Sequence, residues 1–239
     1  MITCVFVVHN VPSRPEPYTM TQQCLNTFFE TVSDNLDAEV ILIDNGSADN
    51  GLIFNLLTSY MNHARVVCKR FEANEPIARC WNWAITQASG DVIVLLNNDV
   101  IFHKSTWLPE LVAPLYRGQA IGVTGSRTMS WNGFVFVEGA FIAFRKNFAL
   151  ELADSGIIFD EQFEFTGEDV DFCHRAVSRG RQLVATGIED RGLVTHIGHG
   201  TLSWSNADGG WNGRSILDVM HESRKRLCRK YHMPERVND

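Results

Sequence analysis

Residues 91–99 read DVIVLLNND, an apolar run that stops at two asparagines and an aspartate. A short run of this kind is typical of a strand that is buried on both faces of a sheet. Similar runs occur earlier, at residues 2–8 (ITCVFVV), 39–43 (EVILI) and 64–68 (ARVVC). Amphipathic stretches of helical period separate these runs, so this half of the chain predicts an α/β fold with a mostly parallel central sheet flanked by helices.

The remaining elements follow from the same periods and from turn residues. We expect helices at residues 21–32, 52–60, 77–88, 107–116, 169–178 and 216–231. We expect further strands at residues 121–125, 183–185 and 193–196, a polar loop at 9–18, and a long strand or a hairpin bent at Gly139 within 134–145. A chain of 239 residues without a linker or an internal repeat then predicts one domain, residues 1–200, with a loop and a basic helix at 201–239 packed on it.

The composition excludes several classes of protein. Hydrophobic residues make up 45% of the chain and charged residues 21%, which argues against disorder. No apolar stretch approaches the roughly 18 residues of a transmembrane segment, and the apolar start lacks the basic region of a signal peptide. The six cysteines form no CxxC pair and are interpreted as buried thiols in a reducing cytosol.

Polar residues gather where three of the predicted strands end. They are His9 and Asn10 after the first strand, Asp44 and Asn45 after the second, and Asn97, Asn98 and Asp99 after the fourth. The carboxyl ends of parallel strands meet at one edge of a sheet, where α/β proteins bind their ligands. Asp99 offers a carboxylate to a divalent cation there. The plainer interpretation of this tripeptide is a turn that ends the strand.

Two later segments also carry candidate chemistry. GEDVD at residues 167–171 begins a predicted helix with three acids, which the helix dipole favours on structural grounds alone. The functional interpretation is a carboxylate general base. THIGHG at residues 195–200 ends a predicted strand, where a histidine is often only a hydrogen-bonded polar residue. Beside an aspartate, the imidazole of His196 makes a site for Mn²⁺ or a similar ion.

Taken in order, the motifs of this chain resemble those of the family 2 inverting glycosyltransferases, which have the GT-A fold. The segments that carry the resemblance are ITCVFVVHN, DNGSADN, NEPIARCWN, SGDVIVLLNNDV, VEGAFIAFRK, FDEQFEFTGEDVDFCHRAVSRG, LVTHIGHGT and, more loosely, ESRKRLCRKYHM. The last is similar to the tail helix of bacterial and viral rhamnosyl- or glucosyltransferases. The sequence departs from the family at Pro76, where glycine is usual, and at the D-x-D motif, which keeps only Asp99.

The resemblance implies a GT-A (Rossmann-like) domain in which residues 1–100 bind a nucleoside-diphosphate sugar and residues 101–200 hold the acceptor and catalytic groups. It implies transfer of the sugar from a UDP- or dTDP-sugar to an acceptor hydroxyl, with inversion. The donor-binding residues would be His9, Asn10, Asp44, Asn45, Ser47, Arg79, Asn97, Asn98 and Asp99. The metal ligands for Mn²⁺ or Mg²⁺ would be Asp99 and His196. Asp169 would be the general base, with Glu168 as a second acid beside it.

The same resemblance implies a glycan, a lipid-linked glycan or a protein as acceptor, in the cytoplasm of a bacterial or virus-infected cell. The net charge of −7 disfavours duplex DNA. Duplex DNA is not excluded as a partner, because the last predicted helix is basic. Its cationic residues are Arg224, Lys225, Arg226, Arg229 and Lys230. That helix is otherwise interpreted as a solvated face, or as an aid to binding pyrophosphate or an anionic acceptor. The loop at 203–213, with Trp204 and Trp211, is a candidate lid over a sugar.

The residues also allow two competing functions to be compared with this one. A nucleotidyltransferase would need a glycine-rich basic loop after the first strand to hold a triphosphate, whereas this chain has HNVPSRPEP. A catalytically inactive nucleotide-sugar-binding module would explain the reduced D-x-D motif. It would not explain why Glu168, Asp169 and His196 are all present.

Overall fold

A computed structural model describes residues 1–10, 16–32, 37–63, 65–164, 166–198 and 214–235. Its centre is a seven-stranded sheet in the order β10-β6-β9-β4-β1-β2-β3. The strands are β1 (Ile2–Val8), β2 (Ala38–Asp44), β3 (Val66–Arg70), β4 (Val92–Leu96), β6 (Ile121–Gly125), β9 (Phe141–Arg145) and β10 (Gln182–Ala185). Neighbouring strands pair in parallel, except that β9 runs antiparallel to both β4 and β6. The predicted α/β fold with a mostly parallel sheet is therefore confirmed.

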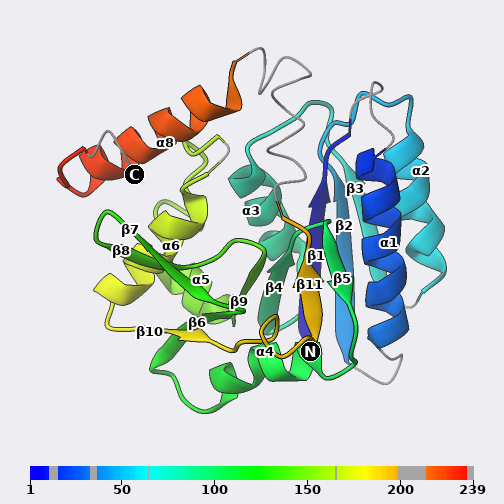
Figure 1. Cartoon of the computed structure of the whole chain (residues 1–239), viewed down its shortest axis with the longest axis horizontal. Coiled ribbons are helices and arrows are strands. Elements are labelled where there is room, and N and C mark those ends of the chain that lie inside the picture. Colours follow the sequence, from blue (N-terminus) through cyan, green and yellow to red (C-terminus); the bar gives the residue numbers. More distant parts are fainter. Residues whose placement is uncertain (11–15, 33–36, 64, 165, 199–213, 236–239) are drawn as a thin grey trace.

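Two small antiparallel sheets stand beside the central one (Figure 1). One pairs β5 (Val100–Phe102) with β11 (Val194–His196), and the other pairs β7 (Thr128–Trp131) with β8 (Phe134–Val137). The helices are α1 (Glu16–Thr31), α2 (Leu52–Ser59), α3 (Ile77–Gln87), α4 (Trp107–Tyr116), α5 (Lys146–Leu152), α6 (Glu168–Ser178) and α8 (Ile216–Lys230), with a 3₁₀ turn, η1, at Tyr60–Asn62.

The apolar runs of the strands are explained by cores on both faces of the sheet. In β4, Val92, Val94 and Leu96 belong to the core that α1, α2 and α4 cover. Ile93 and Leu95 alternate with them and belong to the core that α3, α5 and α6 cover. Because successive side chains of a strand point to opposite faces, a strand covered on both sides needs apolar residues at every position.

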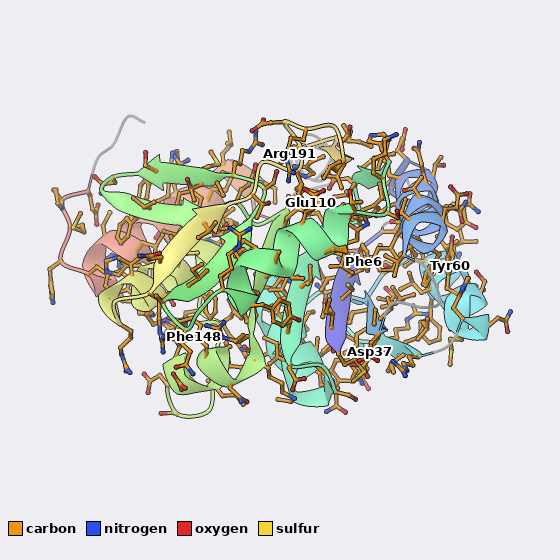
Figure 2. The ribbon with its side chains drawn as sticks, turned by 90° about the horizontal axis from the view of Figure 1, so that it is seen from below. Phe6, Asp37, Tyr60, Glu110, Phe148 and Arg191 are labelled. Atoms are coloured by element: carbon orange, nitrogen blue, oxygen red, sulfur yellow. The ribbon has the colours of Figure 1, made fainter. Side chains whose placement is uncertain are left out.

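Ion pairs of the chain's amino group lie at the amino edge of the sheet. The amino group of Met1 lies 3.3 Å from Asp37 Oδ2 and 3.6 Å from Asp91 Oδ2. Figure 2 shows this region from below, with Asp37 labelled. In the same view, Glu110 of α4 and Arg191 of the β10–β11 connection lie against each other, and they form an ion pair.

One sequence prediction was wrong. Residues 134–145 form neither a long strand nor a hairpin, because β8 pairs with β7 whereas β9 inserts between β4 and β6. The true hairpin turn is Asn132-Gly133, with φ angles of 47° and 85°. Both residues have the left-handed backbone conformation that two-residue hairpin turns require. Asn-Gly is the residue pair that favours such a turn, so the sequence did contain a signal for this hairpin.

Other predictions were displaced or missing. The helix predicted at 21–32 starts earlier, at Glu16, so the polar loop is shorter than expected. Pro17 is tolerated because it lies in the first turn of α1, where a backbone N–H would have no acceptor within the helix. The third strand ends two residues later than predicted, at Arg70. The short elements β5, β7 and α5 were not predicted, since β5 has three residues and β7 is largely exposed.

The C-terminal helix α8 lies beside α6 and the β7–β8 hairpin (Figure 1). Leu227 of α8 packs in one cluster with Phe134, Phe163 and Val170. The six cysteines are free thiols, and five of them are buried as predicted, whereas Cys68 is only half-buried. No described helix combines the length and apolar character needed to cross a bilayer. The loop predicted at 203–213 lies outside the described residues.

Candidate active site

The turn after β2 is held in shape by the segment that leads into α3. Asn45 Nδ2 donates to Asn74 Oδ1 (3.0 Å) and to the carbonyl oxygen of Glu75 (2.8 Å), while Asn45 Oδ1 accepts from the Glu75 N–H (3.0 Å). Gly46 follows with a φ of 65°, and a Cβ atom there would lie 2.2 Å from the carbonyl carbon of Ala73. The Asn45 amide therefore fixes the turn, and only glycine fits beside it.

Asp44, the last residue of β2, is fully buried at the carboxyl edge of the sheet. Its Oδ1 accepts a hydrogen bond from the Ser47 N–H (2.9 Å). Its Oδ2 lies 3.2 Å from Arg70 Nε in an ion pair but accepts no aligned hydrogen bond. Arg70 is the register partner of Asp44 on β3 and also donates to the Ser47 carbonyl (3.0 Å). The result is a buried acceptor oxygen beside a partly exposed guanidinium.

The end of β1 completes this part of the site. His9 Nδ1 lies 2.9 Å from the carbonyl oxygen of Asn45. Burial lowers the pKa of His9 and outweighs the hydrogen bond to that carbonyl, which acts to raise it. Asn10 donates its backbone N–H to Ser47 Oγ (2.9 Å) and its Nδ2 to Asp49 Oδ2 (3.0 Å). Its Oδ1 is buried without a partner.

Two predicted donor-binding residues have other contacts. Arg79 is half exposed and pairs with Glu75 Oε2 (2.9 Å), so it stands at the margin of the β2 turn. Asn98 Nδ2 donates to Thr21 Oγ1 of α1 (2.9 Å). The amide nitrogen of Asn98 therefore already has a hydrogen-bond acceptor within the protein.

Asp99 and His196 are brought together by β5 and β11. These strands pair with His196 opposite Val100, and the Ile197 N–H donates to the Asp99 carbonyl (2.9 Å). Asp99 Oδ1 then lies 3.1 Å from His196 Nε2, and Asn97 Nδ2 lies 3.3 Å from the same nitrogen. The predicted pair of metal-binding side chains is therefore adjacent.

The chemistry of this pair fits a hard divalent cation. Burial acts to lower the pKa of His196, but the close contact and charge of Asp99 outweigh it, so the pKa is raised above its ordinary value. A cation bound by this pair would displace the proton that the imidazole takes up. Adjacent ligands of an octahedral ion are about 3 Å apart, which matches the Asp99–His196 spacing. No cluster of three or more histidine, cysteine or acidic ligands occurs in the described ranges. Mg²⁺ and Mn²⁺ sites are commonly completed by substrate phosphates and water.

The acidic pair at the start of α6 forms the second half of the site. Gly167 precedes it with a φ of 104°. Asp169 Oδ1 accepts from the Val170 N–H (2.8 Å), and its Oδ2 faces Gly139, where a Cβ atom would lie only 3.2 Å away. Glu168 is buried, and its Oε2 has no hydrogen-bond partner.

Burial perturbs both acids. It raises the pKa of Glu168 to about 8, with the charges of Asp169 and Asp171 acting in the same direction. Burial also raises the pKa of Asp169 to about 6, against backbone hydrogen bonds that lower it. Both acids therefore hold their protons to a higher pH than an exposed carboxyl group does, and ionisation of Asp169 raises the pKa of Glu168 further. Raised carboxyl pKa values of this kind are common at acid–base sites.

The β8–β9 connection joins the two halves of the site. The Ala140 carbonyl accepts from the Asn97 N–H (3.2 Å), while the preceding Gly139 lies against Asp169. The negative charge of Glu138 raises the pKa values of both His196 and Asp169. The Asp99–His196 pair and the Glu168–Asp169 pair thus border the same short segment.

Unpartnered polar atoms concentrate at these residues. In the described part of the chain, the buried side-chain oxygen atoms without an aligned hydrogen bond are Asn10 Oδ1, Asp44 Oδ2, Asp99 Oδ1, Glu168 Oε2 and Glu189 Oε2. All but the last belong to residues predicted for the site. Two of them still have a close neighbour, since Arg70 lies beside Asp44 and His196 beside Asp99. Buried polar atoms in folded proteins are nearly always paired, so this concentration makes these residues the candidate site.

Sequence reasoning missed three residues of this region. Arg70 was missed because the third strand was predicted to end two residues early. Gly139 was interpreted only as a bend, although its lack of a side chain makes room for Asp169. Glu189 lies on the β10–β11 connection, and its charge raises the pKa of His196. No local pattern distinguishes it.

Comparisons with solved structures show the same fold at low identity. A mannosyltransferase from Pyrobaculum calidifontis, in complex with GDP-Man and Mn²⁺, has a TM-score of 0.62 and 14% identity, covering 98% of this chain and 65% of that one. Glucosyl-3-phosphoglycerate synthase from Mycobacterium tuberculosis, with Mn²⁺, UDP and phosphoglyceric acid, has a TM-score of 0.59 and 15% identity, covering 98% and 80%. TarS residues 1–349 from S. aureus with UDP-GlcNAc have a TM-score of 0.58 and 17% identity, covering 95% and 67%.

A curated relative and a family model add sequence evidence. The O-antigen biosynthesis protein RfbC of Myxococcus xanthus is 26% identical over 186 residues, which are 62% of this chain. The aligned part spans only 14% of that protein's length. The model of the family described as "Glycosyl transferase family 2" matches residues 4–172, well over half of the chain. On this match, and with a GT-A-like fold, the chain belongs to glycosyl transferase family 2.

Proposed function

We propose that this chain is an inverting glycosyltransferase that moves a sugar from a nucleoside-diphosphate sugar, preferably UDP- or dTDP-linked, to an acceptor hydroxyl. The observation that carries the proposal is the concentration of buried, unpartnered oxygen atoms at predicted site residues. A buried oxygen atom without any partner costs about 1–3 kcal/mol, and this cost applies in full to Asn10 Oδ1 and Glu168 Oε2. At Asp44 and Asp99 a neighbouring Arg70 or His196 offsets part of it. A bound donor and acceptor would supply those partners.

The nucleobase of the donor is assigned to the part of the site next to Asp44, at the carboxyl end of β2. Asp44 Oδ2 is an acceptor without an aligned donor, and the ring N–H of uracil or thymine is a donor of the right kind. Arg70 holds the carboxylate from one side, and the Asn45 amide fixes the turn below it. His9 and Asn10 line the next stretch of the edge, where the nucleoside continues. This support makes residues 1–100 the donor-binding half of the proposed domain.

Asp99 and His196 would hold Mn²⁺ or Mg²⁺ beside the diphosphate. When bound, the cation offsets the negative charge that develops on the leaving nucleoside diphosphate. Asn97, 3.3 Å from His196 Nε2, helps to orient the imidazole. The loss of the other acid from the D-x-D motif is compatible with this role, because Mg²⁺-type sites need only one or two protein ligands besides phosphate.

The acceptor half, residues 101–200, supplies the base. Asp169 Oδ2 takes the proton of the acceptor hydroxyl while the hydroxyl oxygen bonds to the anomeric carbon. The bond from that carbon to the phosphate oxygen breaks on the opposite face, and its electron pair leaves with the nucleoside diphosphate. One displacement inverts the configuration without a covalent sugar–enzyme intermediate. Burial raises the pKa of Glu168, so it can hold a proton and donate a hydrogen bond beside the base.

The relatives support the substrate classes. The solved neighbours are named for complexes with GDP-Man, UDP or UDP-GlcNAc, and two of them for Mn²⁺. The name of the Myxococcus relative supports a role in polysaccharide biosynthesis, with a glycan or lipid-linked glycan as acceptor. The tail segment ESRKRLCRKYHM supports the rhamnosyl- or glucosyltransferase-like branch.

The test is a panel of UDP-, dTDP- and GDP-sugars with Mn²⁺, measured by calorimetry and by donor hydrolysis. We expect one donor to bind and hydrolyse. Asp99→Ala should weaken its Mn²⁺-dependent binding at least tenfold, since a charge-assisted ligand is lost. Asp169→Asn should keep donor binding and lose transfer by about 10²–10⁴-fold.

The matched control is Asp91→Asn, because Asp91 is 92% exposed at the amino edge of the sheet. It should behave as the wild type. Full turnover in Asp169→Asn would remove Asp169 from the base role. Donor binding with neither hydrolysis nor transfer in the wild type would instead favour an inactive nucleotide-sugar-binding module.

A further inference from the structure

The start of α6 has no capping side chain. The first two residues of this helix are Glu168 and Asp169, and the residue before them, Gly167, has no side chain that could cap it. A side chain at that position commonly accepts hydrogen bonds from the first N–H groups of a helix and thereby fixes its start. The placement of the two acids therefore depends on contacts from other elements.

The C-terminal helix α8 supplies apolar contacts at this point (Figure 1). Leu227 of α8 is 1% exposed and shares a cluster with Phe163 and Val170. A Cβ atom at Gly167 would lie 3.3 Å from Leu227 Cδ1 and 3.0 Å from Phe163 Cδ1. Leu227 thus packs directly on the residue that precedes α6, and its cluster includes the neighbour of Asp169.

The end of α8 makes polar contacts with the same part of the chain. Lys230 Nζ lies 2.8 Å from Asp160 Oδ2 and 2.6 Å from Asp171 Oδ1. It therefore joins the segment before α6 to the first turn of α6. Tyr231, directly after α8, donates its hydroxyl hydrogen to Asp171 Oδ1 (2.7 Å). Because Asp171 is fully buried, these contacts are shielded from water.

Two arginines make further contacts with the segment before α6. Arg226 Nη1 donates to the Gln162 carbonyl (2.6 Å). Arg214, which precedes α8, pairs with Glu164 (2.7 Å). An exposed pair of this kind adds little stability by itself. Together with the contacts of Lys230, however, these bonds attach α8 to the chain on both sides of the start of α6.

We propose that α8 positions the acid pair of the proposed active site, with Leu227 and Lys230 as the positioning residues. Leu227 acts through Gly167, and Lys230 acts through Asp171. The proposal rests on the proposed function for the role of Asp169 as base. A base must lie within about 2.6–3.2 Å of the atom whose proton it takes, so a small displacement of the first turn of α6 slows the reaction while the base is still present.

The test compares the loss of α8 contacts with an equal loss of apolar volume elsewhere. Leu227→Ala removes the contact with Gly167. Its matched control is Leu111→Ala in α4, because Leu111 is also fully buried but belongs to the core on the opposite face of the sheet from α6. Lys230→Met removes the charge that joins two carboxylates and keeps the apolar stem, whereas Lys230→Arg keeps the charge. Thermal melts set an assay temperature at which every variant is folded.

Hydrogen exchange measures the positioning without any substrate. The Val170 N–H donates to Asp169 Oδ1 (2.8 Å), and the Asp171 N–H donates to the Gly167 carbonyl (2.8 Å), so both amides report on the start of α6. We expect both to exchange at least tenfold faster in the alanine and methionine variants of α8. In the α4 control they should stay within twofold of the wild type. The amides of β4, which exchange through global unfolding, correct for any general loss of stability.

Donor hydrolysis, in which water replaces the acceptor, measures the consequence for catalysis. The substrate is the nucleotide sugar that the wild type hydrolyses in the donor panel. The kcat of Leu227→Ala and of Lys230→Met should fall at least tenfold, while the calorimetric affinity for that nucleotide sugar stays within twofold. Lys230→Arg should recover most of the lost kcat, and the α4 control should keep the wild-type value.

Three results would overturn the proposal. The first is exchange at the start of α6 that is no faster in the α8 variants than in the α4 control. The second is an unchanged kcat in Leu227→Ala. The third is an equal fall of kcat in Leu227→Ala and Leu111→Ala, because a general loss of stability would then explain both. If the wild type hydrolyses no donor, the proposed function fails, whereas the exchange rates still decide whether α8 positions the start of α6.

Discussion

Replacing Asp171 by asparagine should destabilise the protein strongly. Asp171 is fully buried on α6, yet both oxygens of its carboxylate have partners. Oδ2 accepts from Arg175 Nε (2.8 Å), whereas Oδ1 accepts from Tyr231 OH (2.7 Å) and lies 2.6 Å from Lys230 Nζ in an ion pair. In Glu168, by contrast, the buried Oε2 atom has no hydrogen-bond partner. We therefore assign Asp171 to the attachment of α8 and not to catalysis.

The expected magnitude follows from the burial. Asparagine keeps the volume but removes the charge, so Arg175 and Lys230 lose their shared counter-charge. Breaking a buried ion pair costs about 3–5 kcal/mol. For a chain of this size each kcal/mol corresponds to about 2–4 °C in Tm, so Tm should fall by about 6–20 °C.

Urea unfolding followed by circular dichroism measures the change, with thermal melts as a second readout. Tyr231→Phe is the graded comparison, because it removes one hydrogen bond and leaves both cations paired, at a cost of about 1–2 kcal/mol. If Asp171→Asn is no less stable than Tyr231→Phe, the ion-pair network does not hold α8 to α6 as we argue.

Three further predictions concern the site. The transfer rate should fall as the pH drops through about 6, where a buried Asp169 takes up a proton and stops acting as a base; a pH–rate profile of kcat with its acid limb near pH 4 would contradict this. Gly46→Ala should destabilise the protein by about 2–4 kcal/mol, because the new Cβ would overlap the backbone of Ala73 at a left-handed φ, and urea unfolding would detect it. Gly139→Val should lower kcat for transfer at least tenfold while calorimetric donor affinity stays within twofold, since its side chain would crowd Asp169 Oδ2; a parallel loss of donor affinity would place Gly139 on the donor side instead.

The alternating strands and helices of the first half were predictable because local patterns carry that information. An uninterrupted apolar run such as residues 92–96 has few alternatives to a strand covered on both faces. The polar residues that end those runs had to lie at one edge, because parallel strands place their carboxyl ends together. Asp44, Asn45 and Asp99 could therefore be proposed as neighbours before any coordinates were known.

Local patterns failed where an element is short or where its partner decides its place. β9 reads as the continuation of β8, but it is inserted between β4 and β6. Which edge an apolar strand joins depends on pairing energies distributed over the whole sheet, and the sequence of that strand does not contain them.

The chemistry of the site depended on the tertiary structure in the same way. Asp99 and His196 are far apart in the sequence and meet because β11 pairs with the three-residue β5. The acids Glu168, Asp169 and Asp171 are alike in sequence, yet the fold leaves an oxygen unpartnered on Glu168 and saturates Asp171 with α8. Sequence by itself determined which residues could carry charge and where the buried strands β1, β2 and β4 lie. Only the packing determined which charges stay unpaired, because desolvation and hydrogen bonding depend on contacts between residues far apart in the chain.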